Sequence, residues 1–295
     1  MNILTFDIED WFHILDNDAS KSEKQWKNFE SRLEHNMDKI FKVLDDNHQD
    51  ATFFCLGWVA RKHPDIIKKI NKLGYEIATH SDLHQLTYEF NKKQFTNDLE
   101  RSIKSIEDII GKKVTSYRAP GFSITEKNLW VFDELLKYGI EIDCSVFPVK
   151  RAHGGLEKYG YQEPAYIKRT NGMIKEFPIN FHTVLGKNII FSGGGYFRVI
   201  PYPLLKYFMN QSNYTMSYFH PRDFDPDQPM MEGLNAIRKF KSYCGLSSSL
   251  SKLERLIQDF AFVSLSEANL KIDWEKAKII NFDKRSIDDK YIVKL

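Results

Sequence analysis

The sequence predicts an α/β fold in which parallel strands are joined by crossover helices. Two observations predict this fold. Short apolar segments alternate with segments whose apolar residues recur at helical spacing, and ionisable residues directly follow several of the apolar segments. The chain has 295 residues, of which 42% are hydrophobic, enough to bury a large core. Length alone leaves one domain or two open, because β/α barrels often exceed the usual domain size.

The alternation is clearest between residues 2 and 144. The sharpest helical pattern ends at Gly111 and consists of Phe95, Leu99, Ile103, Ile106 and Ile110. Shorter helical patterns cover residues 33–44, 66–73 and 129–135. Strands are predicted over residues 2–6, 51–56, 75–79, 114–117 and 140–144. Strands that alternate with helices in this way usually pair in parallel.

Beyond residue 146 the pattern is looser and richer in Gly and Pro. Strands are expected there over residues 173–177, 188–191, 215–219 and 261–265, and helices over residues 203–210 and 250–257. No internal repeat or low-complexity segment stands out.

The charge balance and the cysteines exclude several classes of protein. Lys and Arg total 42 against 40 Asp and Glu, a net charge of +2, which gives no reason to expect a nucleic-acid or anionic-membrane partner. The 3 cysteines are widely spaced and form no Cys-x-x-Cys motif, which favours free thiols in a reducing compartment. No signal peptide and no transmembrane segment is recognised, so we expect a cytoplasmic protein.

Ionisable residues stand where the predicted strands end. In a barrel of parallel strands all these ends open on one face, which carries the chemistry. We therefore expect convergence of Asp7, Glu9, Asp10, His80, His84, Arg118, Asp143 and His220.

The strongest local motif is His80-Ser81-Asp82-Leu83-His84. On a helical turn, histidines four residues apart share one face, so both imidazoles can reach one cation. Nitrogen ligands together with a carboxylate suit Zn²⁺ or a similar divalent ion. The alternative is a pair of surface histidines on a helix.

The acidic cluster Asp7-Ile8-Glu9-Asp10 directly follows an apolar strand. One carboxylate could bind the metal while another accepts a proton from water. The sequence does not decide whether Glu9 or Asp10 would reach the ion. The alternative is a solvated loop or a set of helix caps.

Two further segments carry candidate residues. Arg118, which precedes Ala119-Pro120, could hold a carboxylate by a bidentate bond, although an isolated arginine in a turn is usually a surface residue. His220 follows a strand and has an acid, Asp223, close by, as a general acid would.

Taken together, these motifs resemble those of the polysaccharide deacetylases, the NodB-homology group of carbohydrate esterases (family 4). The resemblance runs in order through Thr5-Phe6-Asp7-Ile8-Glu9-Asp10, His80-Ser81-Asp82-Leu83-His84, Arg118-Ala119-Pro120, Asp143-Cys144-Ser145 and His220. There are two departures. The family usually has two adjacent aspartates in the first motif, and its last histidine usually stands in a Leu-x-His setting.

The resemblance implies a distorted (β/α) barrel of the NodB type and a metal-dependent hydrolase. This enzyme would remove the acetyl group of an N-acetylated amino sugar in a polysaccharide or glycan precursor and release acetate. One divalent metal ion, preferably Zn²⁺, would be held by His80, His84 and either Glu9 or Asp10. Asp7 would act as the base.

The remaining roles follow from the same resemblance. Arg118 would orient the base, His220 would protonate the leaving amine, and Asp143 would support the site from a second layer. A backbone N–H near Phe122 would stabilise the oxyanion. The aromatic residues expected to bind substrate are Trp11, Phe122 and Tyr196, and the glycines 193–195 could let the backbone approach a sugar closely.

The resemblance extends to deacetylases associated with exopolysaccharide export. The segments that carry it are Thr5-Phe6-Asp7-Ile8-Glu9-Asp10-Trp11-Phe12-His13, His84-Gln85-Leu86-Thr87-Tyr88, Gly193-Gly194-Gly195-Tyr196-Phe197-Arg198 and His220-Pro221-Arg222-Asp223-Phe224-Asp225-Pro226. We expect a single domain over residues 1–270, with a core over 1–226 and a family-specific part over 227–270. Residues 271–295 would form a C-terminal extension, and the oligomeric state is not predicted.

Three alternatives remain open at this point. His80, Asp82 and His220 could form the two-histidine, one-carboxylate triad of an iron-dependent oxygenase, although the helical periodicities disfavour the all-β fold of those enzymes. The chain could be a carbohydrate-binding paralogue without activity. It could also hydrolyse another amide on the same fold, such as a formamide or a ureide.

Overall fold

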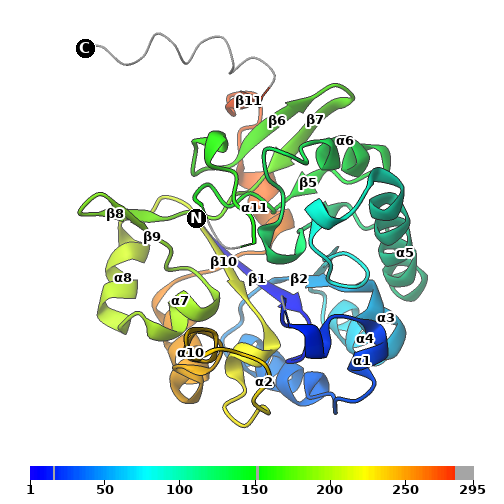
Figure 1. Cartoon of the computed structure of the whole chain (residues 1–295). Coiled ribbons are helices and arrows are strands. Elements are labelled where there is room, and N and C mark those ends of the chain that lie inside the picture. Colours follow the sequence, from blue (N-terminus) through cyan, green and yellow to red (C-terminus); the bar gives the residue numbers. More distant parts are fainter. Residues whose placement is uncertain (16, 151–152, 283–295) are drawn as a thin grey trace.

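The computed structural model describes residues 1–15, 17–150 and 153–282 (Figure 1). Its main feature is a 9-stranded sheet in the order β10-β1-β2-β3-β4-β5-β7-β6-β11. The strands of this sheet are β1 (Asn2–Ile8), β2 (Thr52–Cys55), β3 (Glu76–Thr79), β4 (Ser116–Tyr117), β5 (Ile142–Asp143), β6 (Ala165–Arg169), β7 (Gly172–Glu176), β10 (Thr215–Phe219) and β11 (Ile279–Asn281). A separate hairpin is formed by β8 (His182–Val184) and β9 (Lys187–Ile189).

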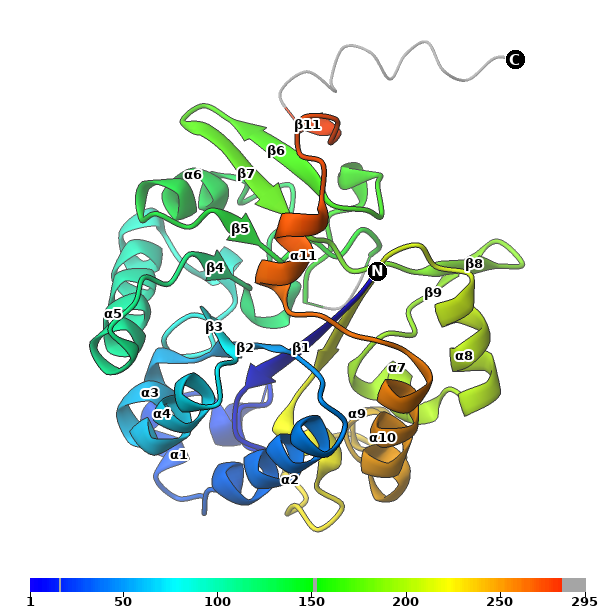
Figure 2. The ribbon, with the colours of Figure 1, turned by 180° about the vertical axis from the view of Figure 1, so that it is seen from behind.

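Helices connect the strands and lie around the outside of the sheet (Figures 1 and 2). They are α1 (Glu23–Trp26), α2 (Leu33–Asp46), α3 (Gly57–Lys62), α4 (Pro64–Lys72), α5 (Lys92–Ile110), α6 (Trp130–Lys137), α7 (Gly194–Val199), α8 (Tyr202–Asn210), α9 (Ala236–Tyr243), α10 (Ser249–Asp259) and α11 (Leu265–Lys271). The predicted α/β fold, built on a central sheet of mostly parallel strands, is confirmed.

The central strands are apolar because both faces of the sheet are covered. Every residue of β2 and β10 is buried, as are the last six of β1. β1 pairs in parallel with β10 on one side and with β2 on the other. The first of the catalytic candidates, Asp7, therefore sits at the end of the most enclosed strand.

Local signals set the ends of the best-predicted helix, α5. The Asn91 side chain accepts a hydrogen bond from the Gln94 backbone N–H, and the Gln94 side chain binds the Asn91 N–H in return. Gly111, with φ of 66°, ends the helix in the left-handed conformation that glycine adopts most easily.

Several elements differ from the sequence predictions. The strand expected over residues 261–265 is wrong, because only Val263 forms a bridge, to Ile3, and α11 begins at Leu265. The neighbouring strands β6 and β7 pair antiparallel as a hairpin, which the helix–strand alternation did not indicate. The glycines at 193–195 open the short helix α7.

The glycine run is explained by close packing within the protein. A Cβ on Gly193 would stand 2.1 Å from the carbonyl oxygen of Tyr218 in β10, and one on Gly195 would stand 3.1 Å from the carbonyl oxygen of Lys241. Gly193 therefore has no room for a side chain against the backbone of β10, and Gly195 has little room against the backbone of α9.

The predicted C-terminal extension contributes a strand to the sheet. Residues 279–281 form β11, which pairs in parallel with β6. The remainder of the predicted extension, residues 283–295, lies outside the described residues. In the described part of the chain, no helix combines the length and the apolar character that a membrane crossing needs.

Replacing Phe53 with alanine should destabilise the protein strongly. Phe53 is fully buried in β2, and its ring centroid lies 5.3 Å from those of Phe6 and Tyr75. The cavity left behind should lower the free energy of unfolding by about 3–5 kcal/mol, measured by urea denaturation. The matched control is Leu270→Ala on α11, where the leucine is 84% exposed, and its effect should stay within about 0.5 kcal/mol. A loss below about 1 kcal/mol for Phe53→Ala would contradict this packing.

Candidate active site

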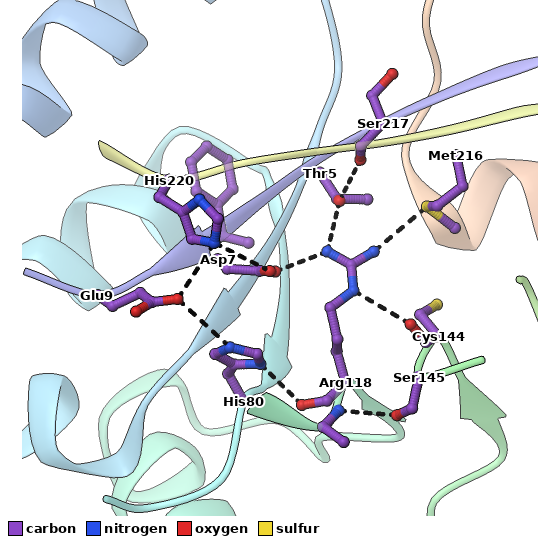
Figure 3. Close-up of polar contacts among 12 residues, drawn as sticks. Thr5, Asp7, Glu9, His80, Arg118, Cys144, Ser145, Met216, Ser217 and His220 are labelled. Atoms are coloured by element: carbon purple, nitrogen blue, oxygen red, sulfur yellow. Dashed lines mark hydrogen bonds and ion pairs between the residues drawn. The ribbon is translucent and has the colours of Figure 1, made fainter. Parts of the chain in front are cut away.

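The candidate residues meet at the carboxyl ends of neighbouring strands (Figure 3). Asp7 and Glu9 come from the end of β1, and His80 and His84 follow β3. Arg118 follows β4, and His220 follows β10. Figure 3 shows the side chains of Asp7, Glu9, His80, Arg118 and His220 directed toward one another from four strands.

A cluster of three side chains presents donor atoms suited to a cation. The donor atoms of Glu9, His80 and His84 all lie within 4.8 Å of one another. A Glu9 carboxylate oxygen lies 3.2 Å from His84 Nε2, and the other lies 3.7 Å from His80 Nε2. Ligands at about 2.0–2.1 Å from a tetrahedral zinc ion stand about 3.3 Å apart, so the two distances between Glu9 and the histidines are close to those of zinc ligands.

Hydrogen bonding and charge prepare this cluster for a cation. His80 Nδ1 donates to the Arg118 carbonyl oxygen at 2.8 Å, which directs the opposite ring nitrogen, Nε2, toward Glu9. Burial acts to raise the pKa of Glu9, but the charges of His84 and His220 and the contacts from His80 and His84 hold it well below its usual range. Glu9 is therefore a carboxylate, the form that binds metals.

The structure identifies which acid of the first motif reaches the cluster. Asp10 turns away: its carboxylate accepts hydrogen bonds from the Ser31 hydroxyl and from the backbone N–H groups of Trp11 and Arg32. Burial raises the pKa of Asp10 despite these bonds. Glu9, left as one of two possibilities by the sequence, is the acid beside the histidines.

The segment that carries the two histidines is a loop, so the helical turn expected there is wrong. Ser81 and His84 adopt positive φ values of 72° and 55°. The loop is fastened to α5, because the Asp98 carboxylate accepts hydrogen bonds from the backbone N–H groups of Asp82 and Leu83, at 3.0 and 3.3 Å. Burial raises the pKa of Asp98 to about 6, although these bonds favour its charged form. The strained loop, not helical spacing, brings the imidazoles together.

Asp82 is not available to a metal in this arrangement. Its carboxylate is paired with Arg61, at 3.0 Å from Nη2, and lies 3.5 Å from Arg101. The carboxylate that the oxygenase alternative requires is therefore directed elsewhere, and the parallel α/β fold also disagrees with that alternative.

Asp7 forms a fully buried ion pair with Arg118. Arg118 Nη1 lies 2.6 Å from an Asp7 carboxylate oxygen and donates also to the Thr5 hydroxyl, at 2.7 Å. The guanidinium stacks on Phe54, 4.1 Å from the ring centroid. The expected bidentate bond is not formed, because the other guanidinium nitrogens bind the Cys144 carbonyl oxygen and the Met216 sulfur.

His220 lies opposite the cation cluster. Its Nε2 is 3.4 Å from a Glu9 oxygen and 3.9 Å from an Asp7 oxygen, and its Nδ1 is 3.0 Å from Asp223. Burial disfavours the imidazolium, but the carboxylates of Glu9, Asp223 and Asp7 outweigh it and raise the pKa of His220 to about 9. His220 thus carries a proton on this side of the site.

Asp223 is itself paired with a buried arginine. Arg198 Nε lies 3.2 Å from the Asp223 oxygen that does not face His220. Burial acts to raise the pKa of Asp223, but the charges of Arg198 and His220 lower it to about 2. Sequence reasoning missed Arg198, because nothing in the spacing of residues 198 and 223 indicates that they meet.

Asp143 lies behind the site and shapes the backbone near Arg118. It accepts hydrogen bonds from the Ser145 N–H and hydroxyl, at 2.9 and 2.6 Å, and the Ser145 oxygen in turn accepts from the Ala119 N–H at 2.8 Å. Burial raises the pKa of Asp143. This series of hydrogen bonds connects Asp143 to Ala119, the residue after Arg118.

The three predicted substrate-binding aromatics differ in position. Trp11 is buried and donates its indole N–H to the Glu30 carbonyl oxygen. Phe122 is buried against Phe147, and its backbone N–H, expected near the oxyanion, donates to the Ala119 carbonyl oxygen. Tyr196 on α7 is 45% exposed. Their predicted contacts with a sugar stay predictions.

His13, which ends the first segment of the resemblance, lies next to the site. It is buried between Trp26 and Trp58, with ring centroids at 4.3 and 5.0 Å, and 6.2 Å from the His84 ring. Burial lowers the pKa of His13 to about 3, so it is neutral. Neutral His13 therefore places no positive charge beside the cation cluster.

Comparison with known proteins agrees with the motifs. Residues 17–139 match the family described as Polysaccharide deacetylase, and residues 144–269 match a domain of unknown function, DUF3473. The Bacillus cereus peptidoglycan-N-acetylglucosamine deacetylase is 24% identical over 104 residues, 35% of this chain and 38% of that protein. The Helicobacter pylori peptidoglycan deacetylase is 28% identical over 109 residues, 37% of this chain and 36% of that protein. The chain thus matches little more than a third of the length of these relatives.

A solved structure extends the likeness to nearly the whole fold. A Mycobacterium smegmatis protein, described under the provisional name polysaccharide deacetylase, superposes with a TM-score of 0.64 over 94% of this chain and 91% of its own, at 17% identity. At that identity the likeness concerns the fold. The family match itself covers residues 17–139, so this part of the chain is assigned to the polysaccharide deacetylase family, and the ordered motifs from Asp7 to His220 agree with it.

Proposed function

We propose that the protein is a metal-dependent de-N-acetylase that hydrolyses the acetamide of an N-acetylated amino sugar in a polysaccharide or glycan precursor. One observation carries the proposal. The imidazole of His220 lies 3.9 Å from the carboxylate of Asp7 and 3.4 Å from Glu9, which belongs to the cation cluster. An acid, a base and cation ligands therefore surround one point, as hydrolysis of an amide requires.

Glu9, His80 and His84 would hold the divalent metal, for which Zn²⁺ is our choice. The mixed nitrogen and oxygen donors and their spacing support this choice. A bound divalent ion would supply Lewis acidity, polarising a carbonyl oxygen and lowering the pKa of water.

Asp7 would accept the proton of the attacking water. Its free carboxylate oxygen faces His220 and the cluster, while the other is held by Arg118 Nη1. The same guanidinium binds Thr5 and Cys144, so it fixes the direction of the Asp7 side chain. Arg118 thus orients the base without contacting the substrate.

His220 would protonate the departing amine. An amine is a poor leaving group unless it receives a proton as the C–N bond breaks, and His220 Nε2 is the acidic group at the mouth of the site. Asp223 binds the opposite nitrogen of the ring and keeps the proton on Nε2 directed into the site. The products are acetate and a free amino sugar.

A glycan substrate is supported by the family match and by the relatives, which are named as peptidoglycan deacetylases. The resemblance to exopolysaccharide-associated deacetylases favours an exopolysaccharide or its precursor here. A formamide or ureide substrate and a paralogue without activity are the competing assignments. An assay of acetate release from a panel of N-acetylated glycans decides among them.

Two substitutions should separate the roles of metal ligand and base. His84→Ala removes one of three donors, so the purified protein should lose both bound metal and acetate release. Asp7→Asn leaves the donors intact, so metal content should persist while turnover falls about 10²- to 10⁴-fold. Elemental analysis and acetate release from N-acetylated oligosaccharides provide the two measurements.

The matched control is His35→Ala, because His35 is an exposed histidine on α2 away from the cluster. It should change neither quantity. Asp7→Asn with most of its activity retained would show that the base is another group. Full metal content in His84→Ala would remove that residue from the ligand set.

Asp223→Asn should impair the amide reaction selectively. Asparagine keeps the shape but removes the charge that orients the His220 proton, so acetate release from an N-acetylated glycan should fall about 10- to 100-fold. Hydrolysis of 4-nitrophenyl acetate should change little, because its phenolate departs without a proton. The control is Asp227→Asn, an exposed acid near the same loop. Equal losses on both substrates would mean that Asp223 serves only the structure of the site.

A further inference from the structure

The short helix α9 is exposed to an unusual degree. None of its residues, Ala236–Tyr243, is buried. Its two large apolar side chains, Ile237 and Phe240, are 68% and 61% exposed and lie three residues apart, on one side of the helix. A globular protein normally turns such a pair toward its core.

The polar residues of α9 are cationic. Arg238, Lys239 and Lys241 lie on the helix, which has no acidic residue. The chain as a whole carries a net charge of only +2, so this concentration of positive charge is local. Exposed apolar side chains flanked by cations are typical of helices that lie in the interface of an anionic membrane.

Polar contacts hold α9 in place, and Tyr243 at its end packs against the hydrophobic core. Arg198 donates to the carbonyl oxygens of Lys241, Ser242 and Cys244, at 2.7, 2.9 and 3.1 Å. At the start of the helix, the Asn235 side chain accepts a hydrogen bond from the Arg238 N–H at 2.9 Å. Ile237 and Phe240 are thus exposed on a helix that hydrogen bonds hold in place at both ends.

A third exposed apolar side chain stands next to this helix. The Tyr243 hydroxyl of α9 accepts a hydrogen bond from the Met231 N–H at 2.7 Å and lies 3.3 Å from the Pro229 carbonyl oxygen. The residue between them, Met230, is 59% exposed. We call Met230, Ile237 and Phe240, together with Lys239 and Lys241, the α9 surface.

We propose that the α9 surface docks on the headgroup layer of an anionic phospholipid membrane. The apolar side chains would enter the boundary between headgroups and acyl chains, and the lysines would pair with lipid phosphates. Charge complementarity selects this occupant over a neutral or basic protein surface. The short helix and its few apolar residues predict weak, reversible association.

Docking at this surface would place the catalytic mouth close to the membrane. Arg198, which holds the end of α9, also pairs with Asp223, the partner of His220. Two side chains, Arg198 and Asp223, therefore connect the backbone of α9 to the proposed acid (Figure 2 shows α9 beside α7 and α10). An N-acetylated glycan carried on a lipid at the membrane surface would be within reach of such an enzyme.

Sedimentation with vesicles tests the proposal on the full-length protein without any substrate. The wild type should partition onto vesicles in which roughly one lipid in three is phosphatidylglycerol, and far less onto pure phosphatidylcholine. Raised salt should weaken the binding. Phe240→Glu and the double variant Lys239→Gln/Lys241→Gln should each reduce partitioning at least about tenfold.

The matched control is Leu270→Glu, which adds the same charge at an exposed leucine on α11 and should leave partitioning unchanged. Each variant should release acetate from a soluble N-acetylated glycan at the wild-type rate, so loss of docking and loss of the proposed activity are separable. Failure of the wild type to bind anionic vesicles overturns the proposal. A dimer seen by light scattering that Phe240→Glu dissociates would assign the surface to a second copy of the chain.

Discussion

A buried guanidinium holds the two halves of the site together. Arg118 binds Asp7 and Thr5 on β1 through its side chain and accepts a hydrogen bond from His80 through its backbone oxygen. The proposed base and one of the proposed metal ligands therefore take their orientation from a single residue after β4. A buried charge needs such a set of partners, since removing one of them leaves the others desolvated and unpaired. This constraint explains why so many buried polar groups gather at the carboxyl ends of these strands.

The opposite wall of the site is built in another way. His220 receives its orientation from Asp223, which is three residues along the chain, and Asp223 receives its charge partner from Arg198 on α7. The first half of the chain thus supplies the proposed cation donors and the proposed base, and the second half supplies the proposed acid. Residues 17–139 match the deacetylase family and residues 144–269 match a domain with no assigned function. One sheet contains both, because β1, which lies outside both matches, pairs with β2 on one side and with β10 on the other. In this protein the second segment completes the site.

Sequence reasoning succeeded where a residue's place depends on strand order and failed where it depends on tertiary contacts. Asp7, His80, Arg118 and His220 all follow strands, and parallel topology brings strand ends together whatever the loops do. Glu9 rather than Asp10 faces the histidines, because Ser31 and Arg32, from a later segment, form hydrogen bonds with the Asp10 carboxylate. The histidine spacing suggested a helical turn, but contacts with Asp98 on α5 impose a loop with two positive φ values. No periodicity in the chain encodes such contacts.

Because the histidine loop is attached to Asp98, helix α5 influences the geometry of the proposed metal ligands. Asp98 touches none of the three donors, yet the backbone bearing His80 and His84 is pinned by its carboxylate. Substitutions along α5 can therefore tune how tightly, and which, ion is retained while every ligand stays the same. Laboratory evolution toward a different metal preference should thus diversify α5 as well as the mouth of the barrel.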